Sequence, residues 1–242
     1  MKILIVNDDG IGASGIRALA TFAKTLGEVT VVAPKVEQSA KSQAIDIHNP
    51  FLVEEVDFME GVRAYTVAST PADCTRFGII GLGERYDIVF SGINDGYNVG
   101  KDIAYSGTVG AIYEAYNLDT PAVAFSHSRH NPPKDLQGAL QQAWDHVVEK
   151  GLLDIHSLYN INLPENEPLG IRYTRQGGAY YSDAFEPMGD GMYRQVGEFI
   201  YEDKNDLSLD TDCVMHGYIS IMPLTMERTD LSVLARLNGL EA

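Results

Sequence analysis

Basic residues are scarce in this 242-residue sequence, in which 18 lysines and arginines face 34 aspartates and glutamates for a formal net charge of −16. Nucleic acids and anionic membrane surfaces would be repelled by such a chain, so we expect neither as a partner. A small anionic substrate is still compatible with this charge, because one bound metal ion can reverse the sign of a local field.

Cysteines and long apolar runs are scarce as well. The two cysteines, Cys74 and Cys213, have no metal-binding spacing, and we expect both to be buried and reduced. The apolar run 3–6 is too short for the core of a signal peptide, and no stretch approaches the ~20 apolar residues of a membrane span. These features favour a cytoplasmic protein without a membrane partner.

The sequence does contain an alternation of short apolar runs and helical stripes. Lys2–Val6 is a continuous β-branched run typical of a strand covered on both faces, and Gly15–Leu26 carries a helical stripe that Gly27 would cap. The alternation continues with expected strands at Val29–Val32, Asp87–Phe90 and Ala122–Phe125 and expected helices at Ala72–Leu82, Val109–Tyr116 and Pro133–Lys150. Repeated β-α-β units predict an α/β fold with a doubly wound, mostly parallel, Rossmann-like sheet, in a single domain over residues 1–242.

Two regions depart from this alternation. Ala44–His48, Leu52–Val56 and Arg63–Val67 are expected strands without helices between them, which predicts an inserted β-hairpin region. From about residue 178 the chain is irregular and acidic, with one clear strand at Gly217–Pro223 and a terminal helix at Leu231–Leu240. Because this segment has few apolar clusters, we expect residues 178–242 to form an oligomerisation hairpin and a C-terminal arm within the single domain.

The first candidate site follows the first expected strand. Asp8 and Asp9 come directly after it, and ligands bind at that edge of open α/β sheets. Gly10, Gly12 and Gly15 then have the G-x-G-x-x-G spacing of a dinucleotide-binding turn, which makes a dinucleotide-binding oxidoreductase one interpretation. Two carboxylates before the turn, and the lack of an acidic residue directly after the second strand, weaken it.

Other interpretations of the aspartate pair are open. Asn-Asp-Asp-Gly is ordinary turn chemistry, so the carboxylates could simply cap a turn. A phospho-receiver module holds magnesium with an acidic pair after its first strand, but it is much shorter than this chain; an aspartyl phosphatase would need an aspartate where position 7 is asparagine. Alternatively, the pair binds a divalent cation that attracts phosphate, and the glycines let the substrate approach the backbone.

Further candidate loops follow the second and third expected strands of the parallel series. The loop 34–40 lies at the same edge of the sheet as Asp8, and Ser91–Gly100 contains three glycines and two asparagines, which suit a ligand-binding loop better than a core. Ser106-Gly107-Thr108 opens an expected helix, whose free N–H groups and hydroxyls form a seat for phosphate or an oxyanion.

Together these motifs resemble the SurE family, the survival-protein-E 5′-nucleotidases. The motifs occur in that family's order and spacing: Asn7–Gly10, Val32–Pro34 with Ser39, Thr70–Cys74, Ser91–Asn94 with Asn98, Tyr105–Val109, and Gly217–Ile221 with Pro223. The resemblance covers nearly the whole chain. It implies a metal-dependent phosphatase for nucleoside monophosphates, raises 3′-nucleotides and short polyphosphates as further substrates, and implies a homodimer or homotetramer with an exchanged C-terminal arm.

The resemblance also implies roles for individual residues. The implied metal ligands are Asp8, Asp9, Ser39 and Asn94, and the implied catalytic set is Asp8, Asp9, Asn94, Asn98, Ser106 and Thr108, with Gly107 in the phosphate seat. Two carboxylates, a hydroxyl and an amide oxygen are hard donors, which suit Mg²⁺ or Mn²⁺. The chain departs from the family's usual residues at Ser69 and Met222, and neither position belongs to these sets.

Other residues have both a functional and a plain structural interpretation. His127 and His130 follow an expected strand and could shuttle protons or form loop hydrogen bonds. Tyr180, Tyr181 and Phe185 could stack a nucleobase or pack in a subunit interface. The remaining candidates have mainly structural interpretations, as surface cations (Arg17, Lys41, Lys101), loop acids (Asp95, Asp102) or a helix-start residue (Asp73).

Overall fold

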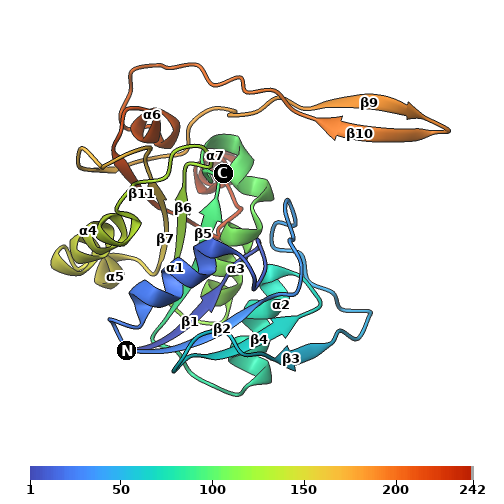
Figure 1. The fold of residues 1–242 in the computed structure, drawn as a ribbon. Coiled ribbons are helices and arrows are strands. Elements are labelled where there is room, and N and C mark those ends of the chain that lie inside the picture. Colours follow the sequence, from blue (N-terminus) through green and yellow to red (C-terminus); the bar gives the residue numbers. More distant parts are fainter. Residues whose placement is uncertain (241–242) are drawn as a thin grey trace.

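The computed structural model describes residues 1–240, and a nine-stranded sheet forms its centre (Figure 1). Its strands are β1 (Lys2–Val6), β2 (Glu28–Pro34), β3 (Val53–Glu55), β4 (Arg63–Val67), β5 (Ile88–Asp95), β6 (Ala122–His127), β7 (Leu158–Leu163), β8 (Ile171–Tyr173) and β11 (Ile219–Pro223). They lie in the order β3-β4-β2-β1-β5-β6-β7-β11-β8, and the central run from β4 to β7 is parallel. The predicted doubly wound, mostly parallel sheet is confirmed.

Helices cover both faces of this sheet. One face carries α1 (Ser14–Ala23), α4 (Leu136–Glu149) and the short α5 (Leu152–Ile155), and the other carries α2 (Pro71–Arg76) and α3 (Gly107–Asn117). Along β1, Ile3 and Ile5 pack toward the first layer, while Leu4 and Val6 pack toward the second. A strand buried on both faces needs the continuous apolar sequence that β1 has.

The order of the strands has its topological switch point beside β1. The chain passes from β1 through α1 to β2 on one side, whereas β5 lies on the other side. At such a reversal the chain leaves the carboxyl ends of β1 and β5 in different directions, and α/β proteins bind ligands at this edge. Gly15 makes the packing of α1 beside β5 feasible, because a Cβ atom there would lie 2.0 Å from the carbonyl oxygen of Ile93.

The predicted insertion is confirmed in part. β3 and β4 pair antiparallel as a hairpin, and β4 adds to the central sheet beside β2. The expected strand Ala44–His48 is wrong, because this segment is irregular. Its backbone pairs with side chains of the α2 region instead: Thr70 Oγ1 donates to Ala44 O (2.6 Å), and Asp46 N donates to Asp73 Oδ2 (3.0 Å). The expected helix cap at Gly27 is also misplaced, since α1 ends at Ala23.

The C-terminal third contains two different structures. β11 inserts into the central sheet, antiparallel to β7 and parallel to β8. The hairpin of β9 (Ala184–Gly189) and β10 (Met192–Val196) instead projects from the body, as Figure 1 shows in orange. Two further helices, α6 (Asp210–Met215) and α7 (Leu231–Leu240), complete the described chain. Among residues 1–240, no helix has the length and apolar character needed to cross a membrane.

Candidate active site

Asp8 is the buried centre of the site at the end of β1. Only 6% of the residue is exposed, and its Oδ1 accepts a hydrogen bond from the hydroxyl of Thr108, which is fully buried on α3. Burial raises the pKa of Asp8 to about 6; the hydrogen bonds from Thr108 oppose this shift, and the charge of Asp9 adds to it. A cation at this position would therefore relieve an unfavourable charge.

Helix α3 approaches Asp8 more closely than any residue with a side chain would allow. A Cβ atom on Gly107 would lie 2.8 Å from Cβ and 3.0 Å from Oδ2 of Asp8. Ser106 caps the helix by accepting a hydrogen bond from the backbone N–H of Val109 (3.1 Å). The N-terminus of a helix favours anions through its N–H groups and dipole, so the start of α3 is suited to bind an anion directly beside Asp8.

Asp9 connects the β1 loop to the loop after β5. Its Oδ2 accepts a hydrogen bond from the backbone N–H of Asp95 (3.3 Å). Burial raises the pKa of Asp9; the N–H of Asp95 lowers it, while the charges of Asp95 and Glu37 raise it further. The adjacent Asn94 uses its side-chain nitrogen to donate to Gly96 O (2.7 Å), so its side-chain oxygen is the atom left for a ligand.

The loop after β2 brings Ser39 to the same edge. The backbone N–H of Gln38 donates to the carbonyl oxygen of Asp8 (2.7 Å), which places the neighbouring Ser39 near the aspartate pair. The hydroxyl of Ser39 donates to Glu37 Oε1 (2.5 Å). Glu37 is thus a third carboxylate in the region, which the sequence analysis did not single out.

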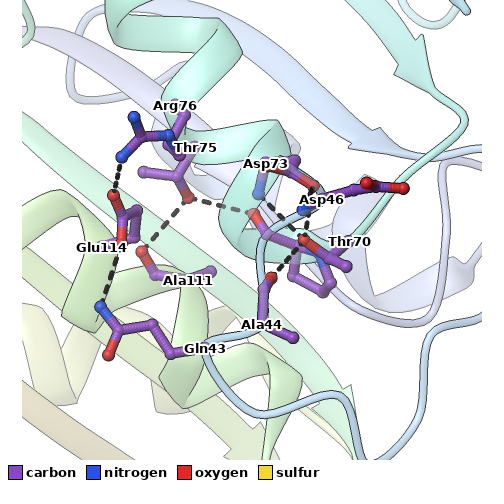
Figure 2. Close-up of polar contacts among 10 residues, drawn as sticks. Gln43, Ala44, Asp46, Thr70, Asp73, Thr75, Arg76, Ala111 and Glu114 are labelled. Atoms are coloured by element: carbon purple, nitrogen blue, oxygen red, sulfur yellow. Dashed lines mark hydrogen bonds and ion pairs between the residues drawn. The ribbon is translucent and has the colours of Figure 1, made fainter. Parts of the chain in front are cut away.

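A partly buried polar cluster holds the chain that follows Ser39. Figure 2 shows Gln43 and Arg76 converging on the carboxylate of Glu114, which lies on α3 and is 5% exposed. Gln43 Nε2 donates to Glu114 Oε2 (3.0 Å), and Arg76 NH1 lies 2.6 Å from Glu114 Oε1. The cluster therefore ties the Ser39 loop to α2 and α3.

Asn98 is held by a layer of buried polar side chains. Its Nδ2 donates to Ser126 Oγ (2.8 Å), and its carbonyl oxygen accepts from the side chains of Asn160 (2.8 Å) and Asn162 (3.0 Å) on β7. Sequence reasoning missed these β7 residues. Their signal was present, because two asparagines at positions i and i+2 of an apolar strand point to the same face.

These residues fit a hard divalent cation. Within residues 1–240 no group of three His, Cys, Asp or Glu side chains could hold a metal ion, so any site here must draw on neutral oxygen donors as well. Neither Asp8 nor Asp9 forms an ion pair with a described basic side chain. Two such carboxylates, with the Ser39 hydroxyl and the Asn94 amide nearby, form a donor set of the kind that Mg²⁺ and Mn²⁺ prefer.

The structure separates the remaining candidates. His127 is buried close to the site, with Nδ1 2.9 Å from the carbonyl oxygen of Ser128 and 4.0 Å from Asp95 Oδ1. Arg17 lies elsewhere, donating to Phe58 O (2.7 Å). Two candidates have structural roles: Asp73 lies in the first turn of α2, and Asp102 accepts hydrogen bonds from backbone N–H groups. The remaining candidates are exposed. Phe185 is 67% exposed on the hairpin, and the other exposed residues are Lys41, Lys101 and His130.

The glycines after Asp9 have packing roles. Gly10 has φ of +93°, and a Cβ atom there would meet Pro34 O at 3.3 Å. Gly15 packs against β5 as described above. Two of the three glycines of the G-x-G-x-x-G spacing are therefore required by packing within the fold, so the spacing is not by itself evidence for a dinucleotide site.

Comparison with known proteins identifies the family. The family model described as Survival protein SurE matches residues 3–183. The chain belongs to the SurE family. A 5′-nucleotidase SurE of Thermoanaerobacter sp. (strain X514) is 38% identical over 248 residues, covering 99% of this chain and 98% of the relative. A 5′-nucleotidase SurE of Thermosipho africanus is 37% identical over 251 residues, covering 98% and 96% of the two chains.

The structural comparison agrees with this membership. The crystal structure of the SurE protein from Aquifex aeolicus is similar to this chain, with a TM-score of 0.79 and 31% sequence identity. The match covers 100% of both chains. The SurE resemblance and the Rossmann-like fold expected from the sequence are thus confirmed. The expectation of an enzyme of the 5′-nucleotidase class agrees with the names of the relatives.

Proposed function

We propose that this SurE-family protein is a 5′-nucleotidase, which hydrolyses nucleoside monophosphates to a nucleoside and inorganic phosphate. The observation that carries the proposal is the contact between the buried Asp8 and the N-terminus of α3, where Thr108 binds Asp8 and Gly107 leaves no room for a side chain. Relatives named 5′-nucleotidase over almost the full length support the same function.

The proposal includes a divalent metal ion, Mg²⁺ or Mn²⁺, held by Asp8, Asp9, Ser39 and Asn94. When bound, such an ion polarises a phosphoryl oxygen and lowers the pKa of a bound water. The residues support this assignment because Asp8 and Asp9 are like charges in a largely buried place, and their pKa values are raised for that reason.

The chain's own residues bind and orient the phosphate. N–H groups in the first turn of α3 and the hydroxyl of Ser106 are placed to bind the phosphoryl oxygens and to stabilise charge that develops on them. Asn98 also lines the phosphate site in this proposal. Asn162 on β7 holds its backbone N–H, and Ser126 holds its side-chain amide. In this proposal Thr108 orients the carboxylate of Asp8.

Phosphate release from a panel of nucleotides tests the function. The panel contains 5′- and 3′-monophosphates and a short polyphosphate, each with and without chelator. We expect release from at least the 5′-monophosphates, its loss with EDTA, and its recovery with Mg²⁺ or Mn²⁺. Full turnover by metal-free protein would contradict the metal assignment. NAD binding without phosphate release would favour an oxidoreductase instead.

We also propose that the protein forms a homodimer or homotetramer through the hairpin and C-terminal arm. The apolar residues of the hairpin are exposed, as Phe185, Met188, Met192 and Tyr193 show. A cytoplasmic location is part of the proposal, and it is supported by two buried cysteines that are free thiols.

A further inference from the structure

Asp210 is a buried carboxylate that lies outside the site described so far. It belongs to the first turn of α6, and none of the residue is exposed. Its Oδ1 accepts the backbone N–H groups of Gly177 (2.7 Å) and Thr211 (2.8 Å), and its Oδ2 accepts that of Gly100 (2.9 Å). Burial raises the pKa of Asp210, and these N–H groups oppose the shift. A carboxylate bound in this way holds its donors firmly, because charge-assisted hydrogen bonds are stronger than neutral ones.

The bond to Gly100 joins α6 to the segment that leads into α3. Gly100 begins the 3₁₀ helix Gly100–Tyr105, and Ser106 follows this helix as the N-cap of α3. Asn98 lies just before Gly100 in the sequence. Asn98 and Ser106, which both belong to the proposed phosphate site, are therefore the two ends of one short segment, residues 98–106.

Further contacts hold Gly100 in the same place. Its φ is +59°, and a Cβ atom there would lie 2.0 Å from the carbonyl oxygen of Gly178. Gln176 Nε2 donates to the carbonyl oxygen of Gly100 (2.9 Å), and the N–H of Lys101 donates to Gly178 O (3.0 Å). The N–H and the carbonyl group of Gly100 thus both bind residues that are distant in the sequence.

The support of segment 98–106 is divided between the sheet and α6. The asparagines of β7 hold Asn98, whereas the next residue, Val99, packs with Tyr180 and Val214 in a small separate apolar cluster. Val214 belongs to α6, so this helix contacts both Val99 and Gly100. A displacement of Gly100 from α6 would therefore change the path of the chain from Asn98 to Ser106.

We propose that Asp210 is a positioning residue for phosphate binding. The inference rests on the proposed function, because it assigns to Asp210 the spacing between Asn98 and Ser106 at the phosphate. The carboxylate fixes the backbone of Gly100, so that both ends of the segment meet the phosphoryl oxygens without a prior rearrangement. Such placement matters, since a misplacement of ~1 Å can cost roughly 100-fold in rate.

Asp210→Asn tests this role with inorganic phosphate as the probe. The amide keeps the shape of the side chain but has only one acceptor oxygen, so at least one of the three N–H donors loses its partner. Phosphate affinity, measured by calorimetry in saturating Mg²⁺, should fall by roughly tenfold or more, and kcat/KM for a nucleoside 5′-monophosphate should fall with it. The melting shift with Mn²⁺ should keep its wild-type size, because the proposed metal ligands lie outside segment 98–106.

Asp212→Asn is the matched control. Asp212 lies on the same helix, is equally buried and accepts two backbone N–H groups, those of Lys204 (3.0 Å) and Asp206 (2.9 Å). Neither donor belongs to segment 98–106. Both variants should therefore melt at a lower temperature than the wild type, but Asp212→Asn should keep wild-type phosphate affinity.

An exposed second position decides the test if Asp210→Asn does not fold. Gln176→Ala removes the bond to the carbonyl oxygen of Gly100, and it should lower phosphate affinity by roughly threefold, the equivalent of one hydrogen bond, without changing the Mn²⁺ shift. Its control is Gln137→Ala, which removes an exposed bond of the same kind and length, from Gln137 Nε2 to Ala18 O (2.9 Å), outside the segment. This control should leave both readouts at their wild-type values.

The outcomes separate positioning from its alternatives. Wild-type phosphate affinity in a folded Asp210→Asn protein, or in Gln176→Ala if the first variant does not fold, would overturn the inference. An equal loss in Asp212→Asn, or a loss of the Mn²⁺ shift together with phosphate affinity, would assign Asp210 a general structural role instead. A wild type that bound phosphate but released none from nucleotides would contradict the proposed function alone, whereas one that bound no phosphate would contradict both.

Discussion

Asp8 and Asp9 are two adjacent carboxylates that the fold has partly removed from water. Burial raises the pKa of both, and no described basic side chain forms an ion pair with either of them. In a protein without a ligand here, this arrangement costs stability, because the hydrogen bonds from Thr108 and Asp95 offset the burial of the two charges only in part. A bound cation would recover that cost, so stability is a direct readout of the proposed metal site.

Asp9→Asn separates a metal ligand from a turn cap. The metal-free variant should be as stable as the wild type or slightly more stable, because one like charge is removed. At ~100 times the dissociation constant, Mn²⁺ should stabilise the wild type by roughly 2.7 kcal/mol, and the variant should show little of this gain. Thermal melts with and without Mn²⁺ measure both effects.

The control for this variant is Asp57→Asn, an exposed aspartate outside the site, which should keep the full response to Mn²⁺. A capping role predicts the opposite result for Asp9. The metal-free variant would then lose ~1 kcal/mol from a missing cap and would keep the wild-type metal shift.

Glu84 gives a pH dependence that is independent of the active site. Its carboxylate lies 2.8 Å from Lys2 Nζ and 2.6 Å from Arg63 NH2, and these partners lower its pKa from 4.5 to about 2. The unfolded chain binds the proton first as pH falls, so this stabilisation is complete above pH 4.5 and is lost between about pH 4.5 and 2.

Glu84→Gln should therefore lower the free energy of unfolding at pH 7, and its difference from the wild type should shrink as pH falls through that window. Urea unfolding at several pH values measures this difference. Glu54→Gln is the control, because its pair with Lys35 is exposed and should contribute little. A difference that stays constant with pH would show that the ion pairs of Glu84 are not its source.

At the scale of elements, the sequence predicts what depends on local patterning. The strand over Lys2–Val6 and the helix over Leu231–Leu240 have the bounds that the sequence predicts, and for the strand a continuous apolar run is sufficient. Ala44–His48 has a similar pattern but forms a loop, since side chains of Thr70 and Asp73 bind its backbone instead of a neighbouring strand. Contacts between segments that are distant in the sequence decided this case.

In the candidate site, too, local motifs are predictable from the sequence, whereas contacts between distant segments are not. The family motifs predict Asp8, Asp9 and the start of α3, each of which lies at the carboxyl edge of the sheet or against it. The sequence marks Asn160 and Asn162 as polar residues on one face of a strand, but it does not assign Asn98 as their partner. The partners are 62 and 64 residues apart, and the pairing of β5 with β6 and of β6 with β7 brings them together.

Docking of the Ser39 loop on α3 yields a prediction at this scale. Gly110 contacts the loop backbone so closely that a Cβ atom would lie 1.9 Å from Ser42 O. Gly110→Ala should displace the loop and Ser39 with it, and kcat/KM should fall by up to ~100-fold, since a 1 Å misplacement has effects of that order. The melting shift with Mn²⁺ should also decrease.

Gly12→Ala is the control for Gly110→Ala, because a Cβ atom at Gly12 would meet nothing within 4 Å although it lies beside the same site. It should keep wild-type kinetics. If Gly110→Ala also behaved like the wild type, docking of the loop on α3 would not be what positions Ser39.

At the scale of the whole molecule, the C-terminal region divides into sheet and arm. β11 is a strand of the central sheet, so a truncation after Tyr201 would remove part of the core and would not report on assembly. The hairpin can be removed separately, because its base is closed by backbone pairing. Ser182 N donates to Glu198 O (2.8 Å), and Ile200 N donates to Tyr180 O (3.1 Å).

Replacing residues 184–196 with Asn-Gly, a two-residue turn suited to hairpins, should reduce the oligomer mass by half or more. A two-stranded hairpin is marginal in water, and this one exposes Phe185, Met192 and Tyr193 to between 61% and 68%. Such an apolar surface persists in a soluble protein when a partner covers it, and a second copy is the partner proposed here. Light scattering gives the mass, and ribose 5-phosphate turnover shows whether the remaining fold is intact. An unchanged mass with intact turnover would show that assembly does not depend on the hairpin.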